Sequence, residues 1–566
     1  MFNYIIVGGG TAGCVLAARL SERSSVSVML IEAGRDISAS DAPPEVRTGY
    51  PAKAYFDHSL VWSDLRATMG TGRRDGEATR SRYEQARLLG GGSSINGMLA
   101  NRGGPADYDE WERLGAKGWA WSDVLPYFIK LERDLQFGGP FHGSNGPQTI
   151  GRIPAEAMSP FVRAVANVLG TQGFPLRDDQ NGEWEEGIFR TVVSMDENGD
   201  RAPVAMTYLS SAVRARKNLT ILTDTKVERL ILEGNRAIGV DMVRSGTKER
   251  LLAHETVVCA GAIHSPVLLM RSGIGPRAQL EKHSIPVIRD LPGVGENLNE
   301  HPSCGISCYL TPGGRWRRSG MHHVQAHYRF SSGMEGCPPI DMNAAILARS
   351  AWHALGARMG SFFFWVNKSY SRGTVRLADA SPAAEPSVDF QLLSDQRDMD
   401  RLKGAFRKIA SIAADPGLDG VRTVSFPTTY SDRVRKVSSP GFFNAMQMRA
   451  FSALLDCAAP VREWLIHHFV TEGTTLAELT RDDDLLEDYL ADRVTGTWHA
   501  AGTCRMGRED DPMAVTDASG LVLGVRRLRV CDASLMPTVP CANTNIPTIM
   551  IAEKIADQVR VENGQG

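Results

Sequence analysis

The sequence predicts a mixed α/β and α+β fold, in which a Rossmann-like nucleotide-binding domain is interleaved with a second domain built on an antiparallel sheet with helices. Three observations lead to this prediction. A strand, a glycine turn and a helix open the chain, longer alternating segments fill its middle, and glycine-rich turns with a closing helix return beyond residue 496. The length of 566 residues also favours two domains over one core.

The opening unit is read from four short segments. Residues 4–7 are an apolar run typical of a buried strand, residues 8–13 form a glycine turn, residues 14–20 follow a helical pattern, and residues 26–31 form a second strand. Short loops between elements of this kind are typical of a parallel βαβ arrangement.

The turn reads Gly8-Gly9-Gly10-Thr11-Ala12-Gly13, a GxGxxG pattern. In this pattern the first glycine permits the tight turn, the second lets the backbone approach a pyrophosphate, and the third lets the helix pack on the strand. Glu32 follows the second strand, where a carboxylate can accept hydrogen bonds from ribose hydroxyls. The pattern therefore predicts an adenine dinucleotide, either FAD or NAD, and argues against NADP.

Further elements are expected along the chain. Residues 37–85 are irregular and rich in proline, glycine and charge. Residues 218–232 and 254–260 are expected to return as strands to the first sheet. In the middle and at the end we expect strands at 360–366 and 374–377, and helices at about 395–414, 482–492 and 547–561.

Composition excludes several classes of function. The net charge of −2 provides no basic field for nucleic acid. No run of 18 apolar residues predicts a membrane span, and the start of the chain lacks the pattern of an export signal. The nine cysteines include no CxxC pair, which favours reduced thiols and a cytoplasmic location. Cys304 and Cys308 lack companion ligands, so no metal site is expected.

Several blocks in order along the chain resemble one family. They are ARLLGGGSSIN at 86–96 with Ala100, Gly103 and Asp109, GAIHSPVLLMRSGIG at 261–275, GVGENL at 293–298 with Glu300-His301, HAAGTCRMG at 499–507, DASLMP at 532–537 and NTNIPT at 543–548. They resemble the signatures of the glucose-methanol-choline (GMC) oxidoreductases. Residues 83–87, 363–368 and 537–540 are similar to those of its aryl-alcohol-type oxidases and, less closely, its choline-dehydrogenase-like members.

The resemblance implies FAD as the cofactor and a discontinuous division of the chain. We expect an FAD-binding domain from residues 1–155, 200–304 and 486–566, and a substrate-binding domain from residues 156–199 and 305–485. Ile95 stands where some relatives carry the histidine that is linked covalently to the flavin. Isoleucine cannot form that bond, so FAD is expected to be bound non-covalently.

The expected chemistry is oxidation of an alcohol. An alcohol loses hydride readily only when a base takes its hydroxyl proton, and histidine suits this because its pKa lies near neutral pH. The resemblance implies that His499 is this base and that Asn543 is a donor that positions the alcohol oxygen. Without the resemblance, His499 would read as a core histidine and Asn543 as a cap of the helix that begins near Asn545.

A larger set of residues is expected at the cofactor. These residues are Gly8, Gly10, Thr11, Ala12, Gly13, Glu32, Ala33, Trp62, Leu89, Asn96, Gly97, Met98, Leu99, Val227, Trp498, Asp532, Ala533 and Thr544. Val227 is equally consistent with an ordinary strand valine, and Trp62 with an ordinary core tryptophan.

Phe364, Trp365 and Val366 are expected to line the substrate pocket, although strand alternation allows only about half of them to face it. Such a wall would favour a primary aryl or furan alcohol. Thr497 stands where oxidase relatives carry an apolar residue, so both O2 and another electron acceptor stay open. A choline-type dehydrogenase, a hydroxynitrile lyase, a non-catalytic flavin-binding protein and a nicotinamide enzyme are the alternatives, and the patterns leave the oligomeric state undetermined.

Overall fold

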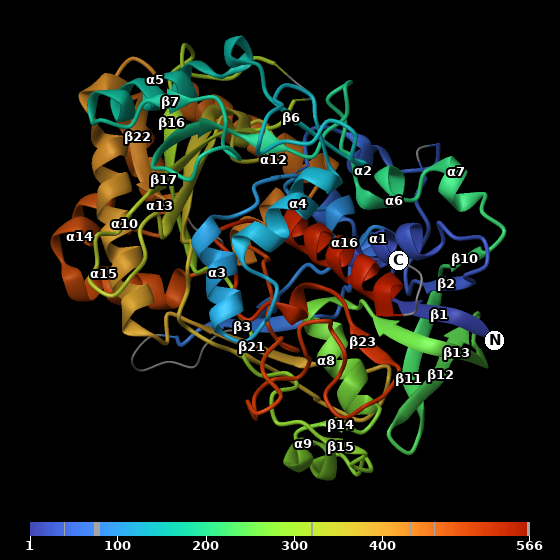
Figure 1. Ribbon diagram of the computed structural model, residues 1–566. Coiled ribbons are helices and arrows are strands. Elements are labelled where there is room, and N and C mark those ends of the chain that lie inside the picture. The colour runs from blue at the N-terminus through green and yellow to red at the C-terminus, as the bar shows by residue number, and fades with distance from the viewer. Residues whose placement is uncertain are drawn as a thin grey trace.

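The structure is a computed structural model (Figure 1). It describes residues 1–38, 40–51, 53–72, 80–318, 321–428, 432–457 and 459–562. Two large sheets lie in different halves of the molecule in Figure 1. One is built around the N-terminal strand, and the other is formed mostly by residues between 303 and 427.

The first sheet has a parallel centre. Its strands are β10 (Leu219–Leu222), β2 (Val28–Ile31), β1 (Phe2–Val7), β13 (Thr247–Val258) and β23 (Leu528–Val530), all parallel to their neighbours. The hairpin of β11 (Thr225–Glu233) and β12 (Arg236–Arg244) extends the long β13 in antiparallel fashion. Val7 pairs with both Ile31 and Val258, so the carboxyl ends of the central strands lie level. The expected strand at 218–232 is therefore two strands with different neighbours.

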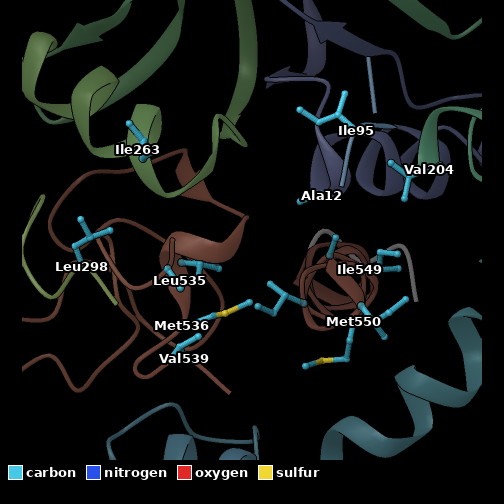
Figure 2. Packing of buried hydrophobic residues seen from close by; sticks show 14 of the residues in the cluster. Ala12, Ile95, Val204, Ile263, Leu298, Leu535, Met536, Val539, Ile549 and Met550 are labelled. Atoms are coloured by element: carbon cyan, nitrogen blue, oxygen red, sulfur yellow. The ribbon is translucent and has the colours of Figure 1, made fainter. Parts of the chain in front are cut away.

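Helices from both ends of the chain cover this sheet. α1 (Thr11–Leu20) packs beside α16 (Asn545–Glu562), and α8 (Gly261–Arg271) follows β13. Figure 2 shows Ile549 and Met550 on α16, seen end-on, among other buried apolar side chains. The Glu553 carboxylate on the same helix accepts hydrogen bonds from Arg19 at 2.7 Å and from the Tyr208 hydroxyl at 2.7 Å, and thereby joins α16 to α1.

The second sheet is largely antiparallel. Its order is β22 (Arg422–Pro427), β16 (Ser303–Leu310), β19 (Met359–Val366), β18 (Met342–Leu347), β17 (Val324–Phe330), β8 (Gly187–Arg190) and β7 (Leu176–Arg177), with only β7 and β8 parallel. The long helix α10 (Gln396–Ala414) packs on one face, where Phe406 meets Phe364 of β19 at a ring distance of 6.2 Å. The opposite face is left to line a cavity.

Two parts of the fold differ from the expectation. The segment 37–85 contains β3 (Arg66–Gly70) and β4 (Arg80–Arg82), although an irregular segment was expected. The expected strand at 374–377 is β20 (Thr374–Arg376), but it pairs with β21 (Ser387–Leu392) and through it with β3, outside the large antiparallel sheet. This small sheet joins segments that were assigned to different domains, and the domain division stays a prediction.

Shorter elements complete the fold. The further strands are β5 (Glu132–Asp134), β6 (Gln148–Arg152), β9 (Val192–Val193), β14 (Ile274–Gly275) and β15 (Arg289–Asp290). The further helices are α2 (Pro44–Arg47), α3 (Pro105–Arg113), α4 (Trp121–Leu131), α5 (Pro160–Thr171), α6 (Val204–Thr207), α7 (Ser211–Arg214), α9 (Arg277–Lys282), α11 (Asp432–Ser438), α12 (Phe442–Cys457), α13 (Arg462–Phe469), α14 (Leu476–Arg481) and α15 (Asp483–Arg493). Within the described ranges, no helix has both the length and the apolar character needed to cross a bilayer.

A buried histidine holds three carboxylates together near β5 and β6. Nδ1 of His142 lies 3.2 Å from Glu132 and 3.3 Å from Asp134, and its Nε2 lies 2.9 Å from Asp179. Arg152 adds a second cation, because its guanidinium contacts Asp134 at 2.8 Å and Asp179 at 3.1 Å. Burial opposes the charged imidazole, but its hydrogen bonds to the carboxylates raise the pKa of His142 to about 10.

This pKa predicts a pH-dependent contribution to stability. Because the folded pKa lies above the unfolded value of about 6.5, the contribution is complete below that pH and disappears as the pH rises through 10. We expect His142→Gln to lower the Tm by a few degrees at pH 6 and to have little effect at pH 10.5, as measured by thermal melts. The exposed His254 provides the control variant His254→Gln. An equal loss of Tm at both pH values would contradict the prediction.

Candidate functional site

One cavity of about 870 Å³ extends between the two sheets. Its walls include the ends of β1 and β2, the first turns of α1 and α16, and the free face of β19. A crevice at the carboxyl ends of parallel strands is where open α/β sheets bind ligands. The cavity therefore lies where the glycine turn predicts a nucleotide.

The glycine turn has the geometry that phosphate binding requires. Gly8 has φ of +103°, and an added Cβ there would lie 2.4 Å from the Cys259 carbonyl oxygen. An added Cβ on Gly13 would lie 1.9 Å from the Gly8 oxygen, so only glycine lets α1 pack this closely. Gly10, the N-cap of α1, offers no capping side chain, and the free N–H groups of the first turn stay available for an anion.

Glu32 closes the other end of this subsite. Its carboxylate is buried and accepts the backbone N–H groups of Gly9 at 2.8 Å and of Gly34 at 2.7 Å. Burial raises its pKa, while these two donors oppose the shift. Each carboxylate oxygen keeps lone pairs for further donors, which fits the hydroxyls of a ribose.

Most of the expected cofactor residues line this one cavity. Those that do are Gly8, Gly10, Thr11, Ala12, Glu32, Ala33, Trp62, Asn96, Gly97, Leu99, Val227, Trp498, Asp532, Ala533 and Thr544. Ile95 lines it as well. The wall also includes His264, a residue of the 261–275 block for which no role was predicted, and its ring lies 4.6 Å from that of Trp62.

Three expected residues lie behind the wall instead. Gly13 packs α1 against the turn, as described above. Leu89 is fully buried, and its side chain lies next to Gly9. Met98 is buried with φ of +61°, and its backbone N–H donates to Asn96 Oδ1 at 2.9 Å. These three residues pack behind the residues that line the cavity. In a turn, a residue that faces the cavity directs its neighbours away from it.

The substrate wall needs a similar correction. Trp365 lines the cavity, but Phe364 and Val366 do not. Successive strand residues point to opposite faces, and Phe364 therefore packs on α10. Met359, Ser361 and Phe363 share the cavity face of β19 with Trp365, and Phe362 also reaches the lining.

His499 and Asn543 lie side by side at the cavity. Nε2 of His499 is 2.9 Å from Nδ2 of Asn543, although the two residues are 44 positions apart. His499 is only 7% exposed, and burial lowers its pKa to about 3. Its imidazole is therefore neutral at neutral pH and can accept a proton. Asn543 is held by its backbone N–H, which donates to Asn101 Oδ1 at 2.9 Å.

A second buried histidine determines which nitrogen of His499 is free. His301 Nε2 lies 3.2 Å from the Pro540 carbonyl oxygen, which can only accept, so this nitrogen carries the hydrogen. Nδ1 of His301 then accepts, and it lies 2.8 Å from Nδ1 of His499, which must donate. Nε2 of His499 is consequently the unprotonated nitrogen, and it faces Asn543.

Glu300 fixes the backbone around this pair. Its buried carboxylate accepts hydrogen bonds from the Tyr83 hydroxyl at 2.9 Å, the Thr497 hydroxyl at 3.0 Å and the backbone N–H groups of His301 and His499, both at 2.8 Å. Burial raises its pKa and the donors oppose that shift. The Thr497 oxygen also lies 2.6 Å from Nδ1 of His499 and can share its hydrogen. The sequence contained Glu300 and His301 only as parts of a motif, without this role.

Comparisons with known proteins show which family and fold this chain resembles. The profile described as "GMC oxidoreductase" matches residues 2–303 with its N-terminal part and residues 369–552 with its C-terminal part. The chain is 42% identical over 568 residues to 5-(hydroxymethyl)furfural oxidase of Methylovorus sp. (strain MP688), covering 99% of this chain and 98% of that protein. It is 34% identical to oxygen-dependent choline dehydrogenase of Pseudomonas fluorescens (strain SBW25), covering 99% and 94%. The crystal structure of pyridoxine 4-oxidase from Mesorbium loti superposes with a TM-score of 0.81 at 28% identity, covering 99% of each chain.

The protonation state of His499 can be observed directly. In protein labelled with [15N]histidine, we expect its ring to stay neutral from pH 8 to pH 5, with hydrogen on Nδ1 and none on Nε2, because burial lowers its pKa to about 3. The signal is assigned by its loss in His499→Asn. A titration midpoint near 6.5, the value of a solvent-exposed histidine, would contradict the geometry.

Proposed function

We propose, because this chain belongs to the GMC oxidoreductase family, that His499 and Asn543 are the catalytic residues with which it oxidises a primary aryl or furan alcohol to the aldehyde. The chain is an FAD-dependent alcohol oxidoreductase. FAD, when bound, supplies the acceptor for the hydride that leaves the alcohol carbon. The single observation that carries the proposal is the 2.9 Å contact between Nε2 of His499 and the Asn543 amide at the wall of the cavity, from which the hydrogen-bond network leaves Nε2 free to accept a proton.

The cavity fits this cofactor in three places. The uncapped start of α1 suits the pyrophosphate, and the spare lone pairs of Glu32 suit the ribose. At the end of the cavity near the histidine pair, the start of α16 lines the wall at Asn545 and Thr548. A helix N-terminus there would favour the negative charge of the reduced isoalloxazine.

The proton step follows from the tautomer of His499. Nε2 accepts the hydroxyl proton of the alcohol, while Nδ2 of Asn543 donates to the alcohol oxygen and orients it. The imidazolium that results keeps its Nδ1 hydrogen between His301 and Thr497, so no other proton has to move. The nearby Glu300 carboxylate, when ionised, attracts this new positive charge.

The pocket favours a neutral aromatic substrate over a quaternary ammonium. Phe363 and Trp365 supply a flat apolar wall. Of the carboxylates on the described lining, Glu84 accepts from the Trp498 indole at 3.1 Å, and Asp532 accepts from Ser265 at 2.6 Å. Glu32 is bonded as above, and Glu472 is paired with Arg493. Glu84 is also paired with Arg435 at 3.4 Å, so neither it nor Glu472 lacks a cationic partner, and Glu32 and Asp532 lie at the nucleotide end. This arrangement supports an aryl or furan alcohol.

We propose O2 as the electron acceptor. The names of the two curated relatives, an oxidase and an oxygen-dependent dehydrogenase, support this choice. Thr497 is compatible with an oxidase, because its hydroxyl is hydrogen-bonded to Glu300 and His499.

We also propose a cytoplasmic location, which the nine free cysteines of the structure support.

Substitution of the histidine and asparagine tests the proposal. With benzyl alcohol as substrate, we expect wild type to release one peroxide per aldehyde, His499→Ala to lower kcat/KM by about a thousandfold, and Asn543→Ala by about tenfold to a hundredfold. Peroxide release and reduction of an artificial acceptor are measured in parallel, with His254→Ala as the control. Unchanged turnover in His499→Ala would remove the proposed base, and aldehyde without peroxide would remove O2 as the acceptor.

The attachment of FAD has its own test. Because Ile95 offers no nucleophile to the flavin, we propose that FAD is held non-covalently. Acid precipitation should leave the yellow colour in the supernatant, and the intact-protein mass should stay at that of the unmodified 61.7 kDa chain. A coloured pellet with an added flavin mass would contradict this.

A further inference from the structure

Four hydroxyl groups form a continuous hydrogen-bonded chain on the cavity wall. The oxygen atoms of Ser350 and Ser361 are 2.5 Å apart, those of Ser361 and Ser307 are 2.7 Å apart, and those of Ser307 and Thr428 are 2.8 Å apart. All four residues line the cavity. Ser307 lies on β16, Ser361 on β19, Ser350 in the segment after β18, and Thr428 directly after β22.

The register of the sheet places this row of hydroxyls away from the catalytic pair. Ser361 shares the cavity face of β19 with Phe363 and Trp365, and it pairs with Ser307 on β16. At about 3.3 Å per residue, Ser361 lies roughly 13 Å along the strand from Trp365. At the other end of this face, Ser303, which pairs with Trp365, is bonded to Thr495, close in sequence to His499. An apolar stretch therefore separates the hydroxyl chain from the proposed base.

Apolar side chains stand beside the hydroxyls on the same sheet. Phe426, Leu347 and Phe363 line the cavity on the strands next to Ser307 and Ser361. A buried hydroxyl is unfavourable unless it is bonded, and an apolar residue would fill such a wall at lower cost. A few polar groups in an apolar pocket usually serve to orient a ligand.

The row of hydroxyls can present either a donor or an acceptor to a ligand. If Ser350 donates to the Met359 carbonyl oxygen, 3.3 Å away, every hydroxyl hydrogen is engaged and the Thr428 oxygen is left to accept. If all four hydroxyls turn the other way, Thr428 has a hydrogen to donate. The same four groups therefore suit a hydroxyl or a carbonyl oxygen.

Beyond the nucleotide end, the charged groups of the described cavity lining do not favour an ionic ligand. His323 and His353 also line the cavity, and burial lowers the pKa of both, that of His353 to about 4, so both are neutral at pH 7. Arg435 is paired with Glu84 at 3.4 Å, and Glu472 with Arg493 at 3.3 Å. A neutral polar group is the best match.

We propose that Ser350, Ser361, Ser307 and Thr428 form a distal subsite that binds the neutral hydroxyl or carbonyl oxygen at the far end of an extended aryl alcohol. The ligand class is an aromatic primary alcohol whose ring and side chain span the apolar stretch, such as a 4-hydroxycinnamyl alcohol. This inference rests on the proposed function, because the same substrate carries its carbinol to His499.

A matched pair of alcohols tests the subsite. Cinnamyl alcohol and 4-hydroxycinnamyl alcohol differ only in the distal hydroxyl, and wild type should show a lower KM for the second. Thr428→Val, which removes the terminal hydroxyl but keeps the shape of the side chain, and Ser307→Ala, which removes the partner of that hydroxyl, should raise KM for 4-hydroxycinnamyl alcohol by about threefold to tenfold, the effect of one lost neutral hydrogen bond. Their kcat, and their KM for cinnamyl alcohol, should stay unchanged.

Two further variants guard against misfolding and against a general effect. Ser307→Thr keeps a hydroxyl and should restore most of the discrimination. Ser425→Ala removes a hydroxyl from the same sheet that donates to Ala413 of α10, outside the cavity lining, and should behave as wild type. Equal KM values for the two alcohols in wild type, or an unchanged ratio in both Thr428→Val and Ser307→Ala, would overturn the subsite.

Binding without turnover separates this inference from the proposed function. The dissociation constants of cinnamaldehyde and 4-hydroxycinnamaldehyde are measured on the holoenzyme from the change in flavin absorbance. A preference for the hydroxylated aldehyde that Thr428→Val abolishes would support the subsite even if no alcohol were oxidised. Oxidation of cinnamyl alcohol with no such preference would keep the function and overturn the subsite.

Discussion

The contact between the Nδ1 atoms of His301 and His499 can form only if one ring donates and the other accepts. The Pro540 carbonyl settles which ring does so, because it forces the hydrogen of His301 onto Nε2. The bare nitrogen of His499 then points to Asn543 rather than into the protein. An isolated buried histidine could adopt either tautomer, and only one of them would place a base at the cavity. The chemistry proposed for this chain therefore depends on a ring that does not line the cavity itself.

The rest of the site is organised around that pair. Glu300 ties together Tyr83 and the backbone of both histidines, and so fixes residues from three distant segments. Burial that lowers the pKa of His499 keeps the base neutral, while the same burial would make its protonated form costly without a carboxylate close by. The site thus combines a dry environment with a nearby acid, and the two effects act on different protonation states of one residue.

The nucleotide-binding turn could be predicted from local patterns, because the glycine turn and the strand before it are formed by residues that are adjacent in the sequence. The pairing of His499 with Asn543 was predicted from family motifs and could not have come from periodicity. The roles of Glu300 and His301 depend on contacts across about two hundred residues, which no local pattern encodes. Phe364 and Val366 were misplaced because alternation gives the spacing of a strand's two faces but not which face meets the cavity. The small sheet of β3 and β21 was missed for a related reason, because its strands are short and lie far apart in the chain.

The contact between α1 and α16 has a consequence for biosynthesis. Thr11, in the glycine turn, donates a hydrogen bond to Asn545 at 2.9 Å, and β23 near the end of the chain completes the sheet that β1 begins. During translation the first strand and turn therefore emerge long before their partners exist. The nucleotide pocket cannot close on a nascent chain until residues 528–562 have left the ribosome, so the early segments must wait in a partly exposed state. A chain truncated before α16 would lack the helix start that Thr11 contacts, and its nucleotide pocket would be open on that side.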